Sequence, residues 1–250
     1  MIRIDAEPRR ADAVACPYLS GKSFVQRYFF AYSLSGSDLG YLLDKGWRHF
    51  GSFFFRPDCP SCQACEPVKI DTFQLKPSAS QQKILKKNSD VEFCTAPLRY
   101  KDEYYRLWDH HSKVRFGTTQ SPQDFERSFF EAVGEGFLTE YRLQGRLAGL
   151  GFCDSTDRGI SSVYFVFHQD FASRSLGIFS VLRECQLARE LNLPWYYLGY
   201  WIRQNPTMAY KGRFRPRRLF DWNSEIWKDD TNFEDQAPTP RFESSDLAES

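Results

Sequence analysis

Hydrophobic and polar positions alternate most clearly in the second half of the chain. Two β-like runs flank a turn at Gly145 within residues 137–154, and residues 160–170 form a third run rich in β-branched and aromatic side chains. Residues 175–194 then show the apolar spacing of a helix that ends at a proline, and residues 195–202 (WYYLGYWI) have the composition of a buried strand. This succession predicts an α/β fold with a mixed sheet.

The first half of the chain mixes aromatic and small residues and predicts shorter elements. Near-helical spacing predicts one or two helices over residues 24–43, before a glycine turn signal. Residues 46–57 (GWRHFGSFFFRP) predict a strand that ends at its proline, and residues 66–75 (EPVKIDTFQL) predict a strand with Phe73 as one of its apolar positions. Residues 101–133 form a further helical region.

Residues 76–90 (KPSASQQKILKKNSD) predict a helix with a lysine-bearing face. Ser78 or Ser80 is placed to cap its N-terminus. The exposed lysines are Lys83, Lys86 and Lys87. Such a face is either simply solvated or contacts phosphate groups, and in the second case it gives salt-sensitive affinity for nucleic acid that is independent of sequence.

Composition places the chain among globular proteins. Its 250 residues are 42% apolar, which is enough for the core of one large domain or two modest ones, and no repeats are apparent. The amino terminus lacks the apolar run of a signal peptide, and no window approaches the roughly 18 uninterrupted apolar residues that span a bilayer. We therefore expect a soluble, cytoplasmic protein without a membrane partner.

Charge is distributed unevenly along the chain. Residues 229–250 hold seven acidic residues and one arginine, a net of −6, so that subtracting them from the chain's +1 leaves +7 on residues 1–228. A basic body suits a polyanionic partner. The acidic segment is too poor in apolar residues to fold alone and predicts a disordered tail. An alternative is that it shields the basic face when no partner is bound.

Seven cysteines, an odd number, favour free thiols or metal ligands over a disulfide framework in a reducing compartment. Three of them have the spacing C-x-x-C-x-x-C, at Cys59, Cys62 and Cys65. A closed zinc or iron–sulfur site needs four ligands, and the nearest candidate for the fourth is Cys16. The alternative is a set of structural thiols in a tight loop pinned by prolines, and both interpretations stay open.

The segment from Arg174 to Gly177 (RSLG) places a serine and a glycine where a helix starts. Free backbone N–H groups and the helix dipole at such a start favour an anion or a developing oxyanion. Acetyltransferase-like folds hold a pyrophosphate in an R-x-x-G loop of this kind, between a β-meander and a helix. A plain serine N-cap explains the same residues equally well.

The chain that follows residues 195–202 is densely aromatic and basic, with Tyr210, Lys211, Arg213, Phe214, Arg215, Arg217 and Arg218. Aromatic faces interleaved with cations stack bases and neutralise phosphates. The alternative is a strand end whose cations extend to solvent. The four histidines form no ligand pattern, so a serine protease or a metallohydrolase finds no support.

Several long motifs follow one another over roughly residues 14–222: CPYL at Cys16, GWRHFGSFFFRPDCPSCQACEPVKI at Gly46, S-x-S-Q at Ser78, SLG at Ser175, and YLGYWI followed by MAYKGRFRP. Together they resemble the arginyl-tRNA–protein transferase family, and most closely its bacterial branch of aspartate/glutamate leucyltransferases. The resemblance covers almost the whole chain, and the shared order of several long motifs argues against chance similarity.

The resemblance implies a smaller cysteine-containing N-terminal domain over residues 1–100, an acetyltransferase-like (GNAT-type) domain over residues 101–228, and the tail. It also implies an aminoacyltransferase that moves an amino acid from a charged tRNA to the free N-terminus of a protein, which marks that protein for degradation by the N-degron pathway. In the bacterial branch the donor is leucyl-tRNA and the acceptor begins with Asp or Glu. The form of the cysteine loop and the YLGYW motif favour leucine over arginine.

Candidate roles follow from this resemblance and from the chemistry of the residues. The catalytic candidates are Tyr164, Ser175, Leu176, Gly177 and Tyr200, with the helix start at the aminoacyl ester and the tyrosines lining the site. Arg48 and Arg56 are expected to bind the acidic acceptor side chain, since arginine pairs with a carboxylate through two hydrogen bonds. The expected tRNA contacts are Lys83, Lys86, Lys87, Tyr210, Lys211, Arg213 and Arg215.

Transfer from an activated ester requires no cofactor. Eukaryotic relatives are implicated in binding an iron–sulfur cluster, so Cys16, Cys59, Cys62 and Cys65 stay a candidate metal or cluster site. The chain departs from the family pattern in its spaced cysteine triplet and at His168, where relatives more often have aspartate. The alternatives are an arginine donor, an acetyl-CoA-dependent acetyltransferase, and an RNA-binding module with a zinc clip. No DNA partner is expected.

Overall fold

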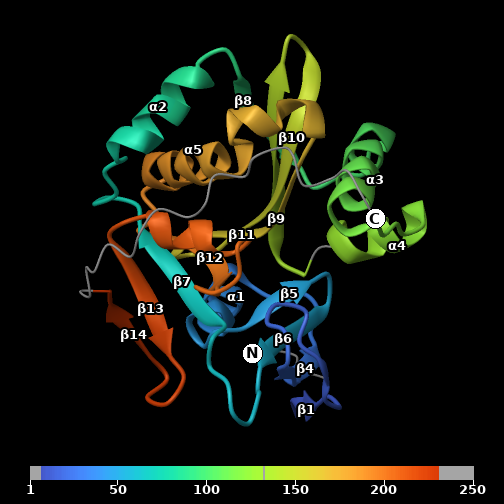
Figure 1. Ribbon diagram of the computed structural model, residues 1–250, viewed down its shortest axis with the longest axis vertical. Coiled ribbons are helices and arrows are strands. Elements are labelled where there is room, and N and C mark those ends of the chain that lie inside the picture. Colours follow the sequence, from blue (N-terminus) through green and yellow to red (C-terminus); the bar gives the residue numbers. More distant parts are fainter. Residues whose placement is uncertain (1–6, 132, 231–250) are drawn as a thin grey trace.

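The computed structural model describes residues 7–131 and 133–230, and its centre is an eight-stranded mixed sheet (Figure 1). The strand order is β14-β13-β7-β12-β11-β10-β9-β8. The strands are β7 (Glu66–Asp71), β8 (Glu92–Pro97), β9 (Glu135–Leu143), β10 (Arg146–Ser155), β11 (Gly159–Phe167), β12 (Trp195–Trp201), β13 (Arg217–Asp221) and β14 (Ile226–Asp229). Neighbours are antiparallel except β11 and β12, which are parallel. The expected α/β fold with a mixed sheet is confirmed.

Helices cover both faces of this sheet. A parallel pair needs a crossover connection, and α5 (Leu176–Glu190) makes the one between β11 and β12. It packs with α2 (Ala79–Lys87) on one face, where Val181, Leu182 and Cys185 meet the large sheet. On the other face lie α3 (Asp102–Phe116) and α4 (Pro122–Phe129), whose buried side chains contact β9 and β10. Short 3-10 turns, η1 (Gln169–Arg174) and η2 (Ala209–Arg213), follow β11 and β12.

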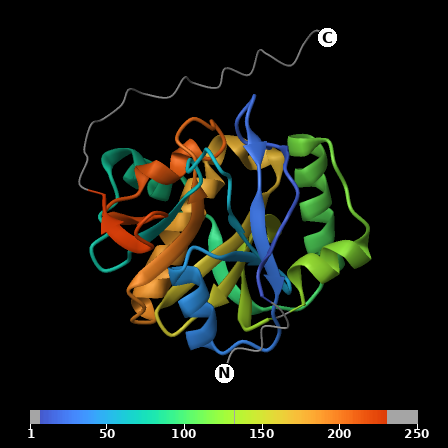
Figure 2. The ribbon, with the colours of Figure 1, turned by 90° about the horizontal axis from the view of Figure 1, so that it is seen from below.

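A second sheet of four strands is built from the N-terminal region. Its order is β1-β4-β6-β5, and its strands are β1 (Arg9–Arg10), β4 (Gln26–Phe30), β5 (Arg48–Phe50) and β6 (Phe53–Pro57). Helix α1 (Gly36–Asp44) packs on one face of it through Leu39, Leu42 and Leu43. A short pair, β2 (Val14–Ala15) and β3 (Ser23–Phe24), precedes β4. The four-stranded sheet lies between α3 and α4 on one side and the β13–β14 hairpin on the other (Figure 2).

The predicted helices over residues 24–43 are partly wrong, because the first part of that range is strand β4. Aromatic residues of β4 pair across the sheet with those of β6, and this pairing overrides the helical spacing. The helix begins only after Ser35, whose hydroxyl accepts the Asp38 backbone N–H at 3.1 Å while the Asp38 carboxylate accepts the Ser35 backbone N–H at 3.2 Å. The capping box therefore fixes the true start of α1.

Two further strand predictions need correction. Residues 46–57 form two strands, β5 and β6, because Gly51 adopts a positive φ of 49° in the turn between them. Phe73 lies beyond the end of β7 and is exposed. In contrast, the helix at residues 76–90 is confirmed as α2, with Ser78 as its cap and Gln81 completing a capping box.

Strand β7 comes from the first hundred residues but lies between β13 and β12 in the large sheet. The two regions therefore share one sheet, and the division at residue 100 stays a prediction. Residues 231–250 of the predicted acidic tail lie outside the described residues. None of the described helices has the length and apolar character needed to cross a membrane.

Candidate active site

The parallel strands β11 and β12 pair over only part of their length. Gly159–Ser161 pair with Trp195–Tyr197, and beyond these residues the two strands have no further register. On its other side β12 shifts register against β7 between Tyr197 and Gly199, where Gly199 has a φ of +85°. We call this divergence the β11–β12 fork. It opens toward the carboxyl ends of the two strands, which is the edge at which α5 follows β11.

The side chain of Arg48 reaches from the four-stranded sheet into the fork. Its Nη1 donates to Ser161 Oγ at 3.0 Å and its Nη2 donates to the carbonyl oxygen of Ser162. Two of the five guanidinium N–H groups are thus used to hold the side chain. Burial lowers the pKa of Arg48 from its ordinary value, but an arginine keeps its charge.

Lys211 lies beside Arg48, at the start of the basic segment that follows β12. Its Nζ donates to the carbonyl oxygen of Tyr200 at 3.0 Å. A methyl group built on Gly199 would lie 3.4 Å from Lys211 Nζ and 3.6 Å from Arg48 Nε, so both cations approach the same glycine. Burial, and then the charge of Arg48, lower the pKa of Lys211 to about 7.

Neither cation has a carboxylate within 4.0 Å in residues 7–131 and 133–230. Asp154 is near enough to act on Arg48 electrostatically, but its Oδ2 lies 2.9 Å from His49 Nε2. Two half-buried cations without a counter-ion are costly unless an anion arrives. The fork is therefore a candidate site for an anionic group.

The two tyrosines predicted for the site flank the fork in different ways. The Tyr200 hydroxyl donates to the carbonyl oxygen of Gly46 at 2.9 Å, with that of Phe55 at 3.3 Å, so it ties β12 to the four-stranded sheet. The Tyr164 ring lies 5.5 Å from that of Phe129, and its hydroxyl has no partner in the described part of the chain. Burial raises the pKa of both phenols. Of these two hydroxyls, that of Tyr164 is the one without a hydrogen-bond partner among the described residues.

The start of α5 is held firmly by residues that directly follow α2. Arg174 pairs with both carboxylate oxygens of Asp90, at 2.7 and 3.0 Å, and the Asn88 side chain donates to the Arg174 carbonyl oxygen at 2.9 Å. Ser175 has a φ of +56° and its side chain does not cap the helix. Among the described residues the N–H groups of Leu176 and Gly177 have no acceptor, the Leu176 side chain is buried, and a methyl group on Gly177 would meet open space. An anion bound at the start of α5 would therefore meet the backbone N–H groups of Leu176 and Gly177.

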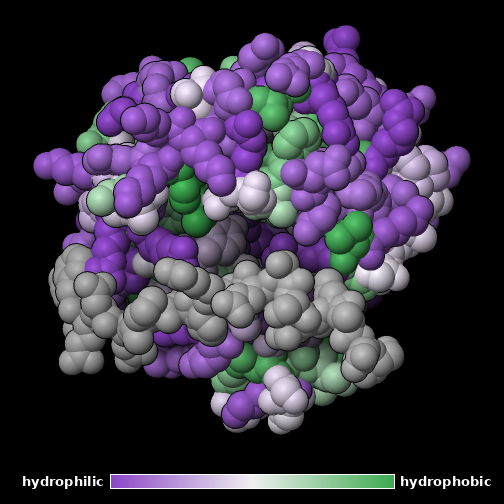
Figure 3. All heavy atoms as spheres, turned by 45° about the horizontal axis from the view of Figure 1, so that its top comes forward, coloured by the Kyte–Doolittle hydropathy of each residue, from purple (hydrophilic) through white to green (hydrophobic). Residues whose placement is uncertain are grey.

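The predicted tRNA-contacting residues fall into two groups. Lys83, Lys86 and Lys87 lie exposed on α2, on a face that is mainly hydrophilic (Figure 3), and Lys87 Nζ donates to the Ser173 carbonyl oxygen at 2.6 Å. The Gln81 side chain donates to the Arg213 carbonyl oxygen at 3.0 Å, which joins α2 to η2. Arg215 and Tyr210 lie in or beside η2, and burial raises the pKa of Tyr210 to about 12. Lys211 instead points into the fork.

Arg56, the second arginine predicted for the acceptor, is already paired. Its Nη1 lies 3.1 Å from Glu225 Oε1, and its guanidinium lies over the Trp47 ring at 5.0 Å. Its side chain is 19% exposed. Arg48 is therefore the better placed of the two to receive a new carboxylate.

The four candidate metal-binding cysteines lie near one another without forming a coordination site. Burial raises the pKa of Cys65 to about 12, and Cys59, Cys16 and Cys62 add to the shift. Cys59 Sγ instead accepts from the Val25 backbone N–H at 3.3 Å. Within the described residues no group of three or more His, Cys, Asp or Glu is arranged to hold a metal ion. In this arrangement the four thiols do not fit a metal ion. A metal-binding role for these cysteines therefore stays a prediction.

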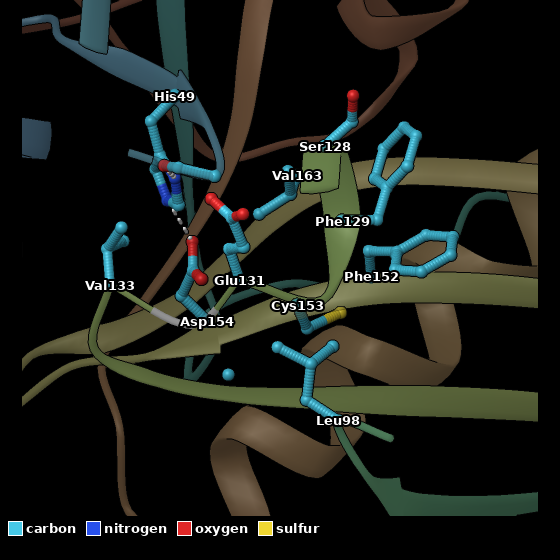
Figure 4. A pocket seen from close by; sticks show the side chains of 12 residues that line it. His49, Leu98, Ser128, Phe129, Glu131, Val133, Phe152, Cys153, Asp154 and Val163 are labelled. Atoms are coloured by element: carbon cyan, nitrogen blue, oxygen red, sulfur yellow. Dashed lines mark hydrogen bonds and ion pairs between the residues drawn. The ribbon is translucent and has the colours of Figure 1, made fainter. Parts of the chain in front are cut away.

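A buried histidine–aspartate pair was missed by the sequence reasoning, which left His49 alone. His49 and Asp154 line a pocket where the four-stranded sheet meets β10 (Figure 4). His49 Nδ1 faces the Gly51 carbonyl oxygen at 2.9 Å, and its ring stacks on Phe54 at 4.7 Å. Because the two partners are 105 residues apart, no local signal could pair them. The pair joins β5 of the four-stranded sheet to β10 of the large sheet, at the residue that follows Arg48 in the sequence.

His168, the residue where relatives more often have aspartate, shapes the turn before α5. Its Nδ1 accepts from the Asp170 backbone N–H at 3.3 Å, and its ring stacks on His110 at 4.1 Å. Arg146 Nη2 lies 2.9 Å from its other ring nitrogen. Burial lowers the pKa of His168, with His110 and Arg146 adding to the shift. It therefore helps position the start of α5.

This geometry defines an α/β protein with a mixed sheet, whose one parallel pair of strands diverges beside the cations Arg48 and Lys211. The chain matches the family described as "Arginine-tRNA-protein transferase, N terminus" over residues 14–83 and "Arginine-tRNA-protein transferase, C terminus" over residues 103–221. The chain belongs to this family of aminoacyl-tRNA–protein transferases, and it is an enzyme.

Relatives named aspartate/glutamate leucyltransferase are similar over most of the chain. That of Marinobacter nauticus is 38% identical over 68% of this chain and 74% of its own. That of Chromobacterium violaceum is 31% identical over 82% of this chain and 86% of its own.

Solved structures are similar only distantly. FemX has a TM-score of 0.46 at 9% identity, covering 77% of this chain and 79% of its own. A tandem GNAT protein from the clavulanic acid biosynthesis pathway has a TM-score of 0.40 at 14% identity, covering 70% and 54%.

Proposed function

We propose that this protein transfers leucine from leucyl-tRNA to the α-amino group of proteins that begin with Asp or Glu, in the cytoplasm and as part of N-degron degradation. The names of its relatives support the donor and the acceptor. An arginine donor is the alternative. The single observation that carries the acceptor class is the arrangement of Arg48 and Lys211 at the fork, neither of which has a carboxylate partner among the residues that the structure describes.

Arg48 is the proposed binding residue for the acidic side chain of the acceptor. Three of its N–H groups are not used by Ser161 and Ser162. A carboxylate is the anion that best matches the planar donor fork of a guanidinium. Arg56, whose charge is already balanced by Glu225, has a secondary part at most.

The reaction itself is a nucleophilic attack of an amine on an ester. The neutral acceptor nitrogen attacks the carbonyl carbon of the leucyl ester, the bond to the tRNA ribose oxygen breaks, and that oxygen takes up a proton. An α-amino group has a pKa near 8, so part of it is neutral at pH 7. Positioning and stabilisation of the oxyanion supply most of the rate, and no cofactor is required.

Neutral Lys211 is the proposed acceptor of the proton that the attacking amine loses. A pKa of about 7 leaves a large part of it uncharged at neutral pH, which is the condition for a general base. We assign the backbone N–H groups of Leu176 and Gly177, which directly follow Ser175, to the carbonyl end of the ester. Tyr164 and Tyr200 line the site, Tyr164 with its hydroxyl and Tyr200 as an anchor of β12.

The body of the tRNA is proposed to bind the basic surface formed by α2 and η2. That surface consists of Lys83, Lys86, Lys87, Tyr210, Arg213 and Arg215. Phosphate contacts of this kind supply affinity that falls steeply with salt.

The test offers the purified protein two peptides that differ only in Asp or Ala at the first residue, with labelled leucyl-tRNA or arginyl-tRNA. Leucine on the Asp peptide alone is the expected result. Incorporation of arginine into the Asp peptide would instead assign the protein to the transferases that use arginyl-tRNA as donor. No incorporation from either tRNA would overturn the proposal.

A further inference from the structure

One face of the four-stranded sheet carries a continuous group of aromatic rings. Tyr28 lies opposite Phe55, and Phe30 and Phe50 lie on either side of Phe53. Ring centroids are 5.5 Å apart for Tyr28 and Phe53, 5.6 Å for Phe30 and Phe53, and 5.8 Å for Phe53 and Phe55. Residues directly opposite on neighbouring strands share a face, so these five rings form one surface. We call it the aromatic face.

The core of the molecule accounts for only part of this face, in which Phe55 packs beside Tyr200 and Ile202 and Phe50 lies against Phe129. The other side of the same sheet supplies Phe29 and Phe54, which stack at 5.2 Å and are buried against α1 together with Trp47. On the aromatic face, by contrast, Phe30 is 45% exposed and Phe50 is 36% exposed. Partly exposed apolar side chains on one connected surface are typical of a binding site.

The aromatic face leads directly to the β11–β12 fork. Phe50 lies 6.2 Å from Tyr164 of β11, and Phe55 lies 6.4 Å from Tyr200 of β12. Arg48, which reaches into the fork, is the residue opposite Phe55. A ligand that lies along the aromatic face therefore ends at the unpaired cations.

Positive charge accompanies the rings at both ends. The cross-strand row runs from Arg9 through Tyr28 and Phe55 to Arg48. Arg9 is exposed and has no carboxylate within 4.0 Å in the part of the chain that the structure describes. Aromatic faces between arginines match a chain of flat bases joined by phosphates.

We propose that the aromatic face binds the unpaired nucleotides at the 3′ end of the aminoacyl-tRNA, by stacking their bases, and thereby directs the aminoacyl ester into the fork. This inference rests on the proposed function. A protein acceptor presents a different second and third residue at each turnover, whereas the unpaired end of the tRNA is the same each time. A built surface of fixed rings suits the constant substrate, because stacking needs no side-chain complementarity.

The test uses deacylated tRNA that carries 2-aminopurine in its unpaired 3′ segment. Stacking quenches this fluorophore, so binding to the wild-type protein should lower its emission. Phe53→Leu and Phe30→Leu keep an apolar side chain but remove the ring. We expect each to lose the quenching and to bind the tRNA about 5-fold or more weakly, because stacking contributes about 1–3 kcal/mol per base.

Tyr41→Leu is the matched control, since Tyr41 is 57% exposed on α1 and does not belong to the aromatic face. It should bind and quench like the wild type. A second comparison removes the unpaired 3′ nucleotides from the tRNA. The trimmed tRNA should bind the wild type more weakly and should bind Phe30→Leu and the wild type equally.

Three results would overturn the inference while leaving the proposed function in place, provided that the wild type still transfers leucine. They are unchanged quenching in both Phe variants, equal binding of trimmed and intact tRNA, and a rise in KM confined to the acceptor peptide, which would assign the face to the protein substrate. A wild-type protein that neither binds tRNA nor transfers an amino acid would instead overturn the proposed function itself.

Discussion

Lys211 and Arg48 lie together at the fork, and the charge of Arg48 affects the protonation of Lys211. The burial of Lys211 and, to a smaller extent, the charge of Arg48 favour the neutral amine, so the pKa of Lys211 falls to about 7. Arg48 keeps its charge under the same conditions. One cation is thus fixed and the other titrates in the physiological range.

If neutral Lys211 accepts a proton, the pH dependence of transfer should reveal it. Both Lys211 and the acceptor amine must be neutral, so kcat/KM should fall below about pH 7 with a slope of two. Lys211→Met should retain only the titration of the acceptor amine and fall with a slope of one. Single-turnover transfer measured from about pH 6 to 9 compares the two profiles. Superimposable profiles would exclude Lys211 as the base.

Gly199 offers a second test at the scale of single residues. Gly199→Ala strains the backbone at φ +85° and adds a methyl group within 3.4 Å of Lys211 Nζ. Gly145→Ala applies comparable strain at φ +77° in a turn where nothing lies within 4 Å. We expect both variants to lose about 1 kcal/mol of unfolding free energy, and only Gly199→Ala to lose transfer by 10-fold or more. Equal transfer rates in the two variants would separate Gly199 from the site.

At the scale of elements, a buried carboxyl group fixes α5 against the sheet. Glu184 of α5 accepts hydrogen bonds from Thr139 Oγ1 at 2.8 Å, from the Tyr141 hydroxyl at 2.9 Å and from the Tyr196 hydroxyl. It joins the helix to β9 and β12. Burial raises the pKa of Glu184 above its ordinary 4.5.

Because the pKa of Glu184 is raised in the folded state, the stability of the fold depends on pH. The folded state holds the proton of Glu184 more tightly than the unfolded chain does, so its stabilising effect is present below about pH 4.5 and is lost as pH rises through the higher folded pKa. Glu184→Gln cannot titrate. As pH rises above about 4.5, the wild type should lose more unfolding free energy in urea than the variant, by up to about 1.4 kcal/mol per unit of pKa shift. Parallel losses would contradict the raised pKa.

Elements with strong local signals could be predicted from the sequence. The alternating runs of β9, β10 and β11 and the serine cap of α2 are encoded within a few residues, and all four appear where expected. Strand β4 was misassigned because its aromatic side chains fit a helix and a strand equally well. Only the pairing with β6 settles the choice. It places Tyr28 opposite Phe55, a residue distant in the sequence.

The whole molecule brings the site together from distant segments. Arg48 comes from the four-stranded sheet and contacts Ser161 at a separation of 113 residues, while Lys211 arrives from η2. The sequence motifs pointed to both residues, but neither spacing nor periodicity could place them side by side. The same holds for His49 and Asp154, which link the two sheets.

In the proposed function, the acceptor is recognised at the place where the two sheets meet. The most direct test compares leucine transfer to peptides that begin with Asp or with its neutral isostere Asn, for the wild type, Arg48→Met and Arg56→Met. Arg56 is the matched control, because Glu225 already balances its charge. Thermal unfolding of each variant controls for loss of fold.

We predict that the wild type prefers Asp by 10-fold or more in kcat/KM, that Arg48→Met loses this preference, and that Arg56→Met keeps it. A buried, hydrogen-bonded charge pair of this kind contributes about 2–5 kcal/mol when one partner is removed. An Arg48→Met protein that still distinguishes Asp from Asn, or an Arg56→Met protein that no longer does, would contradict the assignment of acceptor recognition to the fork.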